Sequence, residues 1–542
     1  MKSRKTGICI VLMALLLCTA GGAFAQTMET GQLMRVSLQK RIPSTYGTTG
    51  TVIMNDIQQW KPGETAIIIC DMWNQHWCKG ATERVTEMAP AINNVITIAR
   101  NKGALIVHAP SDCMDFYKDH PGRKLAKKYA SKKAARLISE EKLDTEKGSA
   151  WPIDQSDEGC DDDVECKQFN PWKRQIDLIE IADNDAISDS GAEMAGLFAK
   201  KGIKNVILMG VHTNMCVIGR SFGLRNMVRL GMNVVLMRDL TDVMYDHKQW
   251  PKVSHFTGTS LVAEYIEANV CPSMLSSDLT GEKQFRFKQD ARPVVAFIIA
   301  ENEYHANETL PAFAHELLLE KNVTCEFALG KPVYTGEGIH NIENLQIMQD
   351  ADLAVIQVRR RALPAEQMKL IKDYANSGKP IIGLRTASHA FNANQVVPNS
   401  GGGVAAASGK VAAFLDQWPE FDQEVIGGNY QGHYGQMATG TVFSFVPGMG
   451  GHPLLKGVST ASFTGPVVEL HTLYQNSPLR SPNVQVLLTG KIPDKPEEPV
   501  LWINHRGKGT VLYTSLGHWE DWKNAQFHQV MFNAMDYLLK KP

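Results

Sequence analysis

Short apolar runs alternate with helix-period segments along the first half of the chain. Between the first two runs, apolar positions recur with the spacing of a helix face, from Met88 to Ala99. Continuous apolar strands separated by helices predict a doubly wound parallel sheet. The runs predicted to be its strands are 66–70, 104–108, 177–181, 206–209 and 233–237. Residues 109–176 form a long, charged insertion, which we expect to shape a site rather than build core.

The alternation stops in a polar stretch and then restarts in the second half. Residues 311–321 read as a helix with Thr309 as its N-cap. The Gly-rich stretch 400–409 reads as a loop, and the chain ends in two strands and a closing helix. Further elements are predicted at 294–300, 353–358 and 380–384 (strands) and near 364–376 (helix). No internal repeat is evident, so we predict two different doubly wound α/β domains.

Length sets the number of domains. A chain of 542 residues is too long for one compact core and predicts two large domains or three small ones. The expected division is a signal peptide (1–25), an N-terminal extension (26–63), a first domain (64–271), a linker (272–291) and a second domain (292–542).

Composition narrows the class of protein. Hydrophobic residues make up 44% and charged residues 21%, which argues against a largely disordered chain and against a multi-span membrane protein. Lys and Arg number 56 and Asp and Glu 57, so the formal net charge is −1. This balance gives no electrostatic case for nucleic-acid binding.

The N-terminus has the layout of a secretory signal. Lys2, Arg4 and Lys5 precede the apolar run 8–17, and an A-x-A pattern ends at Ala25. The run is shorter than the roughly 20 residues that a membrane span needs. We therefore expect cleavage after Ala25 and a secreted or periplasmic protein with no membrane attachment.

Eight cysteines remain after the predicted cleavage. Export implies an oxidising compartment, where disulfides persist. Cys160 and Cys166 lie six residues apart in an acidic segment (GCDDDVEC), and we favour a local disulfide between them. A metal site is the weaker interpretation, because neither a second cysteine pair nor a nearby His completes a four-ligand set.

The segment GVHTNMCVIGR places Cys216 just past a strand and at the expected start of a helix. Unpaired N–H groups at a helix N-terminus favour a thiolate, lower its pKa and can hold an oxyanion. A buried structural Cys is the alternative.

Two motifs resemble the isochorismatase-like cysteine hydrolases, a group that includes nicotinamidases and other amidases. The motifs are the strand-end sequence IIICDMWN and the pattern G-V-x-T-x-x-C-V, over residues 64–270. The resemblance implies Asp71 and Cys216 as members of an Asp–Lys–Cys triad. It also implies a cis peptide at Val211–His212, with the His212 and Cys216 N–H groups as the oxyanion hole.

The reaction implied is C–N bond hydrolysis: Asp71 takes the thiol proton, Cys216 attacks the carbonyl carbon, and water cleaves a thioester-type intermediate. The family Lys is missing. Its expected place, near Ala182 or Asp183, carries no Lys. Its loss leaves three alternatives: an inactive domain, a shifted substrate, or a substitute base, for which the candidates are Lys173, Arg174 and Arg84.

Metal-binding members of the family carry an Asp and two His near the triad. Here a divalent metal would need Asp112, His120 and His76. The favoured interpretation is that these residues, with Asp183, line a pocket. The aromatic residues expected to wall it are Trp73, Trp77 and Phe116.

Polar residues also follow predicted strands in the second half, where ligands of open α/β sheets bind. They are Glu303, His305, Arg385, His389, His433 and His518. The stretches G-L-x-x-x-S-H and G-K-G-x-V-x-Y-T-S-L-G-H resemble the trehalose-utilisation (ThuA-like) family, over 292–540. This implies a flavodoxin-like, amidotransferase-like fold and a link to carbohydrate metabolism.

Three hypotheses result. The first is a secreted cysteine hydrolase that cleaves a C–N bond and carries a carbohydrate-related accessory domain. The second is a degenerate protein that binds a sugar-like ligand without turnover. The third places catalysis in the second domain, through His305, His389 and His433. All three expect a small-molecule partner, amide or sugar-related, and no nucleic acid. The sequence leaves open whether the chain forms a homo-oligomer.

Overall fold

The computed structural model describes residues 32–44, 51–164, 166–301, 303–331, 338–393, 415–434, 441–463 and 473–540. The expected signal peptide with its cleavage site, and the Gly-rich stretch 400–409, lie outside these residues. Within them, no helix is long and apolar enough to cross a membrane.

The first domain is built on an eight-stranded sheet with the order β2-β1-β8-β7-β6-β3-β4-β5. Strands β3 to β8 are parallel, and their order across the sheet, counted from β5 to β8, is the 3-2-1-4-5-6 of a doubly wound fold. The strands are β3 (Thr65–Cys70), β4 (Leu105–Ala109), β5 (Ala186–Ile187), β6 (Asn205–Val211), β7 (Asn233–Asp242) and β8 (Ser273–Met274). The predicted parallel sheet is confirmed.

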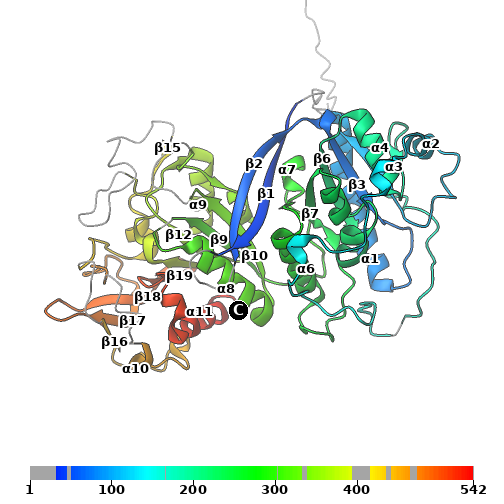
Figure 1. Ribbon diagram of the computed structural model, residues 1–542. Coiled ribbons are helices and arrows are strands. Elements are labelled where there is room, and N and C mark those ends of the chain that lie inside the picture. Colours follow the sequence, from blue (N-terminus) through cyan, green and yellow to red (C-terminus); the bar gives the residue numbers. More distant parts are fainter. Residues whose placement is uncertain are drawn as a thin grey trace, which may run out of the picture.

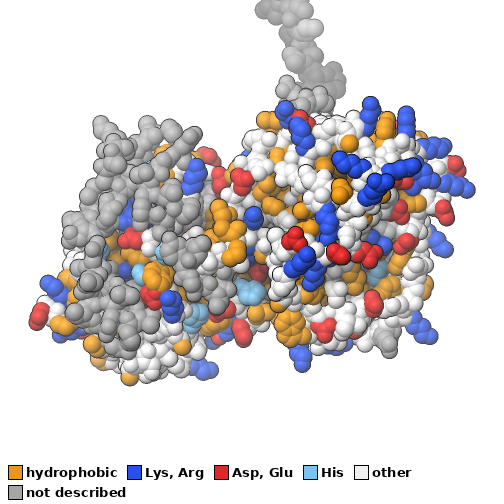
Figure 2. Space-filling view, in the orientation of Figure 1, with side chains coloured by type: hydrophobic (Ala, Val, Ile, Leu, Met, Phe, Trp, Pro, Cys, Tyr) orange, Lys and Arg blue, Asp and Glu red, His pale blue; other side chains and the backbone are white. Residues whose placement is uncertain are grey.

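Helices cover both faces of this sheet (Figure 1). Apolar residues of α1 (Lys79–Lys102) pack with Ile67 and Ile69, while the opposite face, with Ile68, meets α4 and α6. The other helices of this domain are α2 (Pro121–Lys128), α3 (Lys132–Ala135), α4 (Gly191–Lys201), α5 (Leu224–Arg229), α6 (His255–Asn269) and α7 (Ser277–Thr280). Acidic and basic side chains mix on this domain, with Lys and Arg denser over α2 and α3 (Figure 2).

The third strand is not where the apolar run predicts it. Residues 177–181 form a turn, and the short strand β5 begins at Ala186. Ile179 is buried, but Leu178 is exposed, so the run anchors the insertion against the core without pairing in the sheet.

The second domain has a nine-stranded sheet with the order β11-β10-β9-β12-β14-β19-β18-β17-β16. Its parallel centre, β10-β9-β12-β14-β19, has the 2-1-3-4-5 order of flavodoxin-like folds, as expected. The strands are β9 (Val294–Ala300), β10 (Thr324–Gly330), β11 (Ile342–Glu343), β12 (Leu353–Val358), β14 (Ile381–Leu384), β16 (Val442–Phe445), β17 (Val484–Lys491), β18 (Glu498–Arg506) and β19 (Gly509–Thr514).

Helix α8 (Ala306–Lys321) and the closing helix α11 (Ala525–Leu538) pack on one face of this sheet, and α9 (Ala365–Asn376) on the other. The small elements are α10 (Thr460–Phe463) and the two-stranded pair β13 (Leu363–Pro364) and β15 (Leu415–Asp416). The predicted N-cap is wrong: α8 begins one turn earlier, with His305 as its N-cap, and the Thr309 hydroxyl donates to the His305 carbonyl.

The expected N-terminal extension is part of the structure that joins the domains. Strands β1 (Met34–Pro43) and β2 (Thr51–Trp60) form an antiparallel hairpin on the edge of the first sheet, through β8. Ile53 of the same hairpin packs in the hydrophobic core of the second domain. Figure 1 shows the hairpin lying between the two domains. The expected linker also contributes structure, since it contains β8 and α7.

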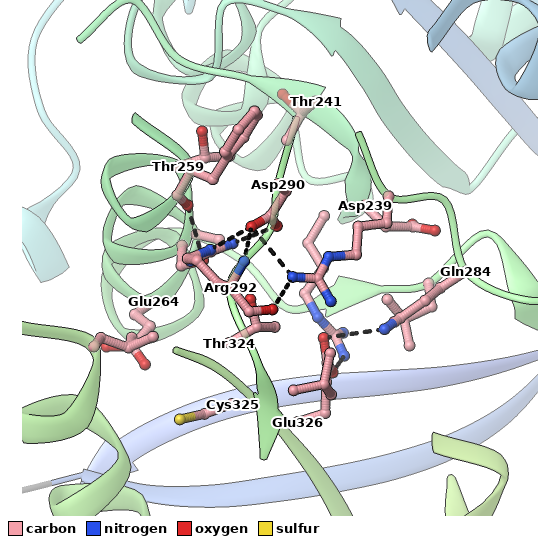
Figure 3. A pocket seen from close by; sticks show the side chains of 18 of the residues that line it. Asp239, Thr241, Thr259, Glu264, Gln284, Asp290, Arg292, Thr324, Cys325 and Glu326 are labelled. Carbon is pink, nitrogen blue, oxygen red and sulfur yellow. Dashed lines mark hydrogen bonds and ion pairs between the residues drawn. The ribbon is translucent and has the colours of Figure 1, made fainter. Parts of the chain in front are cut away.

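Ion pairs surround a cavity of about 130 Å³ at the junction of the domains (Figure 3). Arg238 of β7 pairs with Glu326 of β10 at 3.3 Å, and Arg41 of the hairpin pairs with Glu264 at 2.7 Å and Glu267 at 2.9 Å. Arg292, which pairs with Asp290, also donates to Thr257 and Ser260 of α6. In each pair the two charges are opposite in sign, so their attraction holds the junction together.

We predict that Arg41→Ala lowers the free energy of unfolding by about 3–5 kcal/mol, because it leaves Glu267 as a buried charge without its cation. Urea unfolding followed by tryptophan fluorescence measures the change. Lys40→Ala is the matched control, since Lys40 is the neighbouring cation on the same strand but is exposed. Equal stability of the two variants would contradict a stabilising role for this pair.

Candidate functional site

The first candidate site lies where the strand order of the first sheet reverses. β3 is the first strand of the doubly wound order and β6 the fourth, and they are paired in parallel from Thr65↔Asn205 to Cys70↔Gly210. Asp71 directly follows β3, and Cys216 follows β6 by five residues. Ligands of open α/β sheets bind at this kind of crevice. The two residues expected to be catalytic are therefore brought together by strand pairing.

Asp71 is fully buried and has φ 46°, a left-handed backbone conformation. Its Oδ1 accepts the Ser111 N–H at 2.7 Å. Burial raises the pKa of Asp71 to about 6, against the opposing effects of Arg220, the Ser111 N–H and the Cys216 thiol. A carboxyl group with this pKa can both take and return a proton near neutral pH.

Cys216 lies in a short π-helical turn, Thr213–Val217, rather than at the start of an α-helix. Burial and the Asp71 charge raise the pKa of its thiol, and Arg220 offsets this only in part. The expectation of a lowered pKa is therefore wrong, because burial and the neighbouring Asp71 charge disfavour the thiolate. The thiol needs Asp71 as a base when it reacts.

Arg220 is the cation of the site. Its Nε lies 3.6 Å from Asp71 Oδ2, and its terminal nitrogen lies 3.6 Å from Asp112 Oδ2. Its charge lowers the pKa values of both Asp71 and Cys216. Sequence reasoning missed this residue, although it lies four positions after the nucleophile in GVHTNMCVIGR.

The three cations proposed from the sequence are placed elsewhere. Arg84 pairs with Asp161 and Asp242, and Arg174 pairs with Asp177. Lys173 is exposed. Arg84 and Arg174 are therefore engaged by other carboxylates, and Arg220 is the cation that pairs with Asp71, so the proposal that one of the three replaces the family Lys is corrected.

The place of the family Lys also shifts, because the third strand is β5. Ser188 follows that strand and precedes α4, and its hydroxyl donates to Glu193. Asp183 is exposed on the preceding turn, so its expected role in the pocket is not supported. Asp185, two residues later, pairs with Arg100 and His108.

Aromatic side chains stack beside the site. Trp73 lies on Trp172 with ring centroids 4.4 Å apart, and His76 stacks on Trp172 at 5.6 Å. Trp73, Cys113 and Ile187 pack together, with Trp172 and Cys216 against them. Trp172 comes from the end of the long insertion, which therefore helps to build the site as predicted. Phe116, also expected here, is 61% exposed.

The peptide Val211–His212 is cis, as the resemblance implies. The His212 ring is buried and its edge meets His76, with centroids 5.0 Å apart. Burial and His76 hold the pKa of His212 well below its usual range, and burial lowers the pKa of His76 to about 4. Both rings are therefore neutral at neutral pH.

The metal set suggested by the sequence is not assembled. His120 caps α2 through its ring nitrogen, Asp112 faces Arg220, and the Nδ1 of His76 accepts the Cys78 N–H. Among the residues that the structure describes, these three do not form a metal-binding group. The predicted disulfide is not formed either, because Cys160 and Cys166 are free thiols.

A second candidate site lies at the β9/β12 reversal of the second sheet. The Arg385 guanidinium lies 4.2 Å from the centroid of Tyr304 and 4.7 Å from that of Tyr474. His389 stacks on Tyr430 at 4.4 Å, and the rings of His518 and Tyr304 lie 5.4 Å apart. His433 pairs with Tyr474 through their backbones, in an antiparallel β-bridge. Glu303 pairs with Arg359 at 2.9 Å. His305 is the N-cap of α8, and its ring lies beside the ring of Trp519. Three of the histidines expected from the sequence, His389, His433 and His518, therefore lie beside tyrosines that the sequence analysis did not predict as part of the site.

Three consecutive arginines after β12 were also missed. Arg359, Arg360 and Arg361 are each at most 2% exposed. Burial and the charge of Arg359 lower the pKa of Arg360 to about 10. The signal that could have identified them is the segment QVRRRALP, in which three arginines directly follow an apolar strand.

Comparison with known proteins finds similarity to proteins of two kinds. Residues 391–538 match the family model "Trehalose utilisation" (ThuA). A cysteine hydrolase from Pseudomonas syringae is 14% identical, covering 41% of this chain and 92% of its own (TM-score 0.26). An isochorismatase family protein from Burkholderia thailandensis is 10% identical, covering 40% and 95% (TM-score 0.24). A protein described as ThuA-like, from Parabacteroides merdae, is 13% identical, covering 46% and 93% (TM-score 0.28). No curated protein matches the chain.

We predict that alkylation of Cys216 by iodoacetamide accelerates as the pH rises through about 6, because only ionised Asp71 accepts the thiol proton. In Arg220→Gln the reaction slows and its rise moves to higher pH, because Arg220 lowers the pKa of Asp71. Peptide mass mapping locates the label. Arg174→Gln is the control, because Arg174 is a cation that was proposed from the sequence alone and pairs with Asp177 instead. Identical pH profiles for the Arg220 and Arg174 variants would exclude Arg220 from the site.

Proposed function

We propose that the first domain is a cysteine hydrolase that cleaves a C–N bond of a small amide-like substrate. The observation that carries the proposal is the contact of the buried Asp71 with both the Cys216 thiol and Arg220 at the ends of two neighbouring strands. A buried carboxyl group beside a thiol gives the nucleophile a base, and the cation keeps that base ionised near neutral pH.

The reaction proceeds in two halves. Asp71 removes the Cys216 proton as the sulfur attacks the carbonyl carbon, and the N–H groups of His212 and Cys216 hold the oxyanion. Asp71 then gives its proton to the leaving nitrogen, which departs as the amine and leaves a thioester. Water, deprotonated by Asp71, cleaves the thioester to release the acid and the free thiol.

The walls of the site restrict the substrate. Trp73 and Trp172 present stacked indole rings, and His76 and His212 are neutral. Such a site favours a planar, uncharged group next to the scissile bond, because flat π faces stack on indole rings. Export to the periplasm or the cell exterior belongs to the same proposal.

We expect Cys216→Ala to abolish hydrolysis and Asp71→Asn to reduce kcat/KM by about 10²–10⁴-fold, the usual contribution of a positioned base. Ammonia or amine release from a library of small amides measures the activity. Cys113→Ser is the matched control, since Cys113 packs in the same cluster as Cys216 but has no role in the proposed reaction. Turnover that survives Cys216→Ala would place catalysis elsewhere.

A second candidate function belongs to the second domain, which we propose binds an anionic, sugar-like ligand. It is favoured by the buried run Arg359–Arg361 and by Arg385, which lies on Tyr304 and Tyr474. The charges of Arg359, Arg360 and Arg385 all act on His389, so these three arginines share one neighbourhood. Arginine recognises carboxylate and phosphate groups through paired hydrogen bonds, and aromatic rings stack on sugar faces.

We predict that sugar phosphates or uronic acids bind this domain and that Arg385→Gln weakens the binding at least about tenfold, the effect of one lost charge-assisted contact. Calorimetry on the full chain measures it. Arg506→Gln, a change at the C-terminal end of β18, is the control, and this variant should bind the ligand as the parent does. Binding that is the same for both variants, or equal affinity for the uncharged parent sugars, would contradict an anion site.

A further inference from the structure

A cluster of sulfur and carboxylate groups lies at the N-terminus of α1, apart from both candidate sites. The ligand atoms of Cys78, Cys160 and Asp162 all lie within 4.8 Å of one another. Cys166 adds a third sulfur, since its Sγ lies 2.9 Å from Asp162 Oδ2, and Cys160 Sγ lies 3.5 Å from the same oxygen. Cys78 directly precedes α1, whereas the other three residues belong to the long insertion.

We propose that these four residues bind one zinc ion or a similar thiophilic divalent cation. Zn²⁺ prefers four ligands in a tetrahedron and takes Cys sulfur and Asp oxygen, with Zn–S distances of about 2.3 Å. Donor atoms a few ångströms apart suit this geometry, because two ligands of a tetrahedral ion are separated by about 1.6 times the metal–ligand bond length, roughly 3.8 Å for two sulfurs. Binding deprotonates the three thiols and releases their protons to solvent.

The number of thiols favours a metal over a disulfide. A disulfide between Cys160 and Cys166, or between Cys160 and Cys78, leaves the third sulfur of the cluster unused. All three thiols are free in the structure. A metal ion uses all three and also the Asp162 carboxylate, which no disulfide explains.

The surroundings suit a cluster of negative ligands. Asp162 accepts the N–H groups of Lys79 at 2.8 Å and Gly80 at 3.0 Å, and Cys78 Sγ accepts that of Ala81 at 3.4 Å. These are N–H groups of the first turn of α1, whose dipole favours negative charge. Arg84, one turn further along, pairs with Asp161 at 2.8 Å and adds a buried cation next to the cluster. Hydrogen bonds of this kind orient the ligands of metal sites.

The ion would fix the insertion to the strand-end segment of the first site. Cys78 donates its N–H to His76 at 3.1 Å, and His76 stacks on Trp172 beside Cys216. Trp77 packs against the same cysteines. The role inferred is structural: the metal holds two segments far apart in sequence and is not placed at the reacting atoms. The inference does not depend on hydrolase activity.

The test is metal analysis of the full chain, purified under reducing conditions and equilibrated with Zn²⁺. We expect one equivalent of zinc per chain that survives gel filtration. With Co²⁺ we expect the intense sulfur-to-cobalt charge-transfer absorption of a tetrahedral thiolate site. Chelator treatment should lower the melting temperature, and zinc should restore it.

Two variants separate ligand loss from misfolding. Cys166→Ser and Asp162→Asn should each lose tight zinc binding and the thiolate–cobalt spectrum while keeping the far-UV circular dichroism of the parent. Cys325→Ser, a cysteine of the second domain, is the control and should bind one equivalent. If a variant does not fold, the zinc titration of the unmodified chain still tests the proposal.

Three results would overturn the proposal. The first is a chain that binds no zinc although its three thiols are reduced. The second is a disulfide between two of the three cysteines, Cys78, Cys160 and Cys166, that is present in the non-reduced protein and forms again after reduction even when zinc is supplied. The third is unchanged zinc content in both ligand variants.

Discussion

The parallel pairing of β3 with β6 is the constraint on which the first site depends. The paired residues are buried along the ladder, and a slip of one residue would turn their apolar side chains from one helix layer to the other. Register is therefore fixed by the core, and the core fixes the positions of Asp71 and Cys216 beyond the strand ends. The chemistry is thus positioned by hydrophobic burial that takes no part in it.

Burial also sets the electrostatics of that site. Removing Asp71 from water favours its neutral form, so without a nearby cation a smaller fraction of it would be ionised and able to accept a proton. Arg220 supplies the charge from the turn that carries the nucleophile, whereas Ser188 occupies the place after the third strand. A fixed guanidinium cannot lose its proton in proteins, so it can tune Asp71 and Cys216 without joining the proton transfer.

The two domains repeat one architectural solution with different chemistry. In each, polar residues follow parallel strands where the strand order reverses, with a carboxyl group and a thiol in one and arginines and tyrosines in the other. The β1–β2 hairpin joins them, because it extends the first sheet while Ile53 enters the second core. Ion pairs of opposite charge, made by Arg41 and Arg238, line the cavity at the junction.

The sequence by itself determined the features that neighbouring residues encode: the buried strands such as β9 and β12, the two doubly wound sheets, and Asp71 and Cys216 within their motifs. It misplaced the third strand, because a short apolar run reads alike whether it pairs in a sheet or only anchors a loop. Only the tertiary structure decided that Trp172 stacks on Trp73 and that Cys78 meets Cys160. Those contacts depend on the path of a long insertion, whose polar residues carry no periodic signal, and they form only when the packed core brings its ends together.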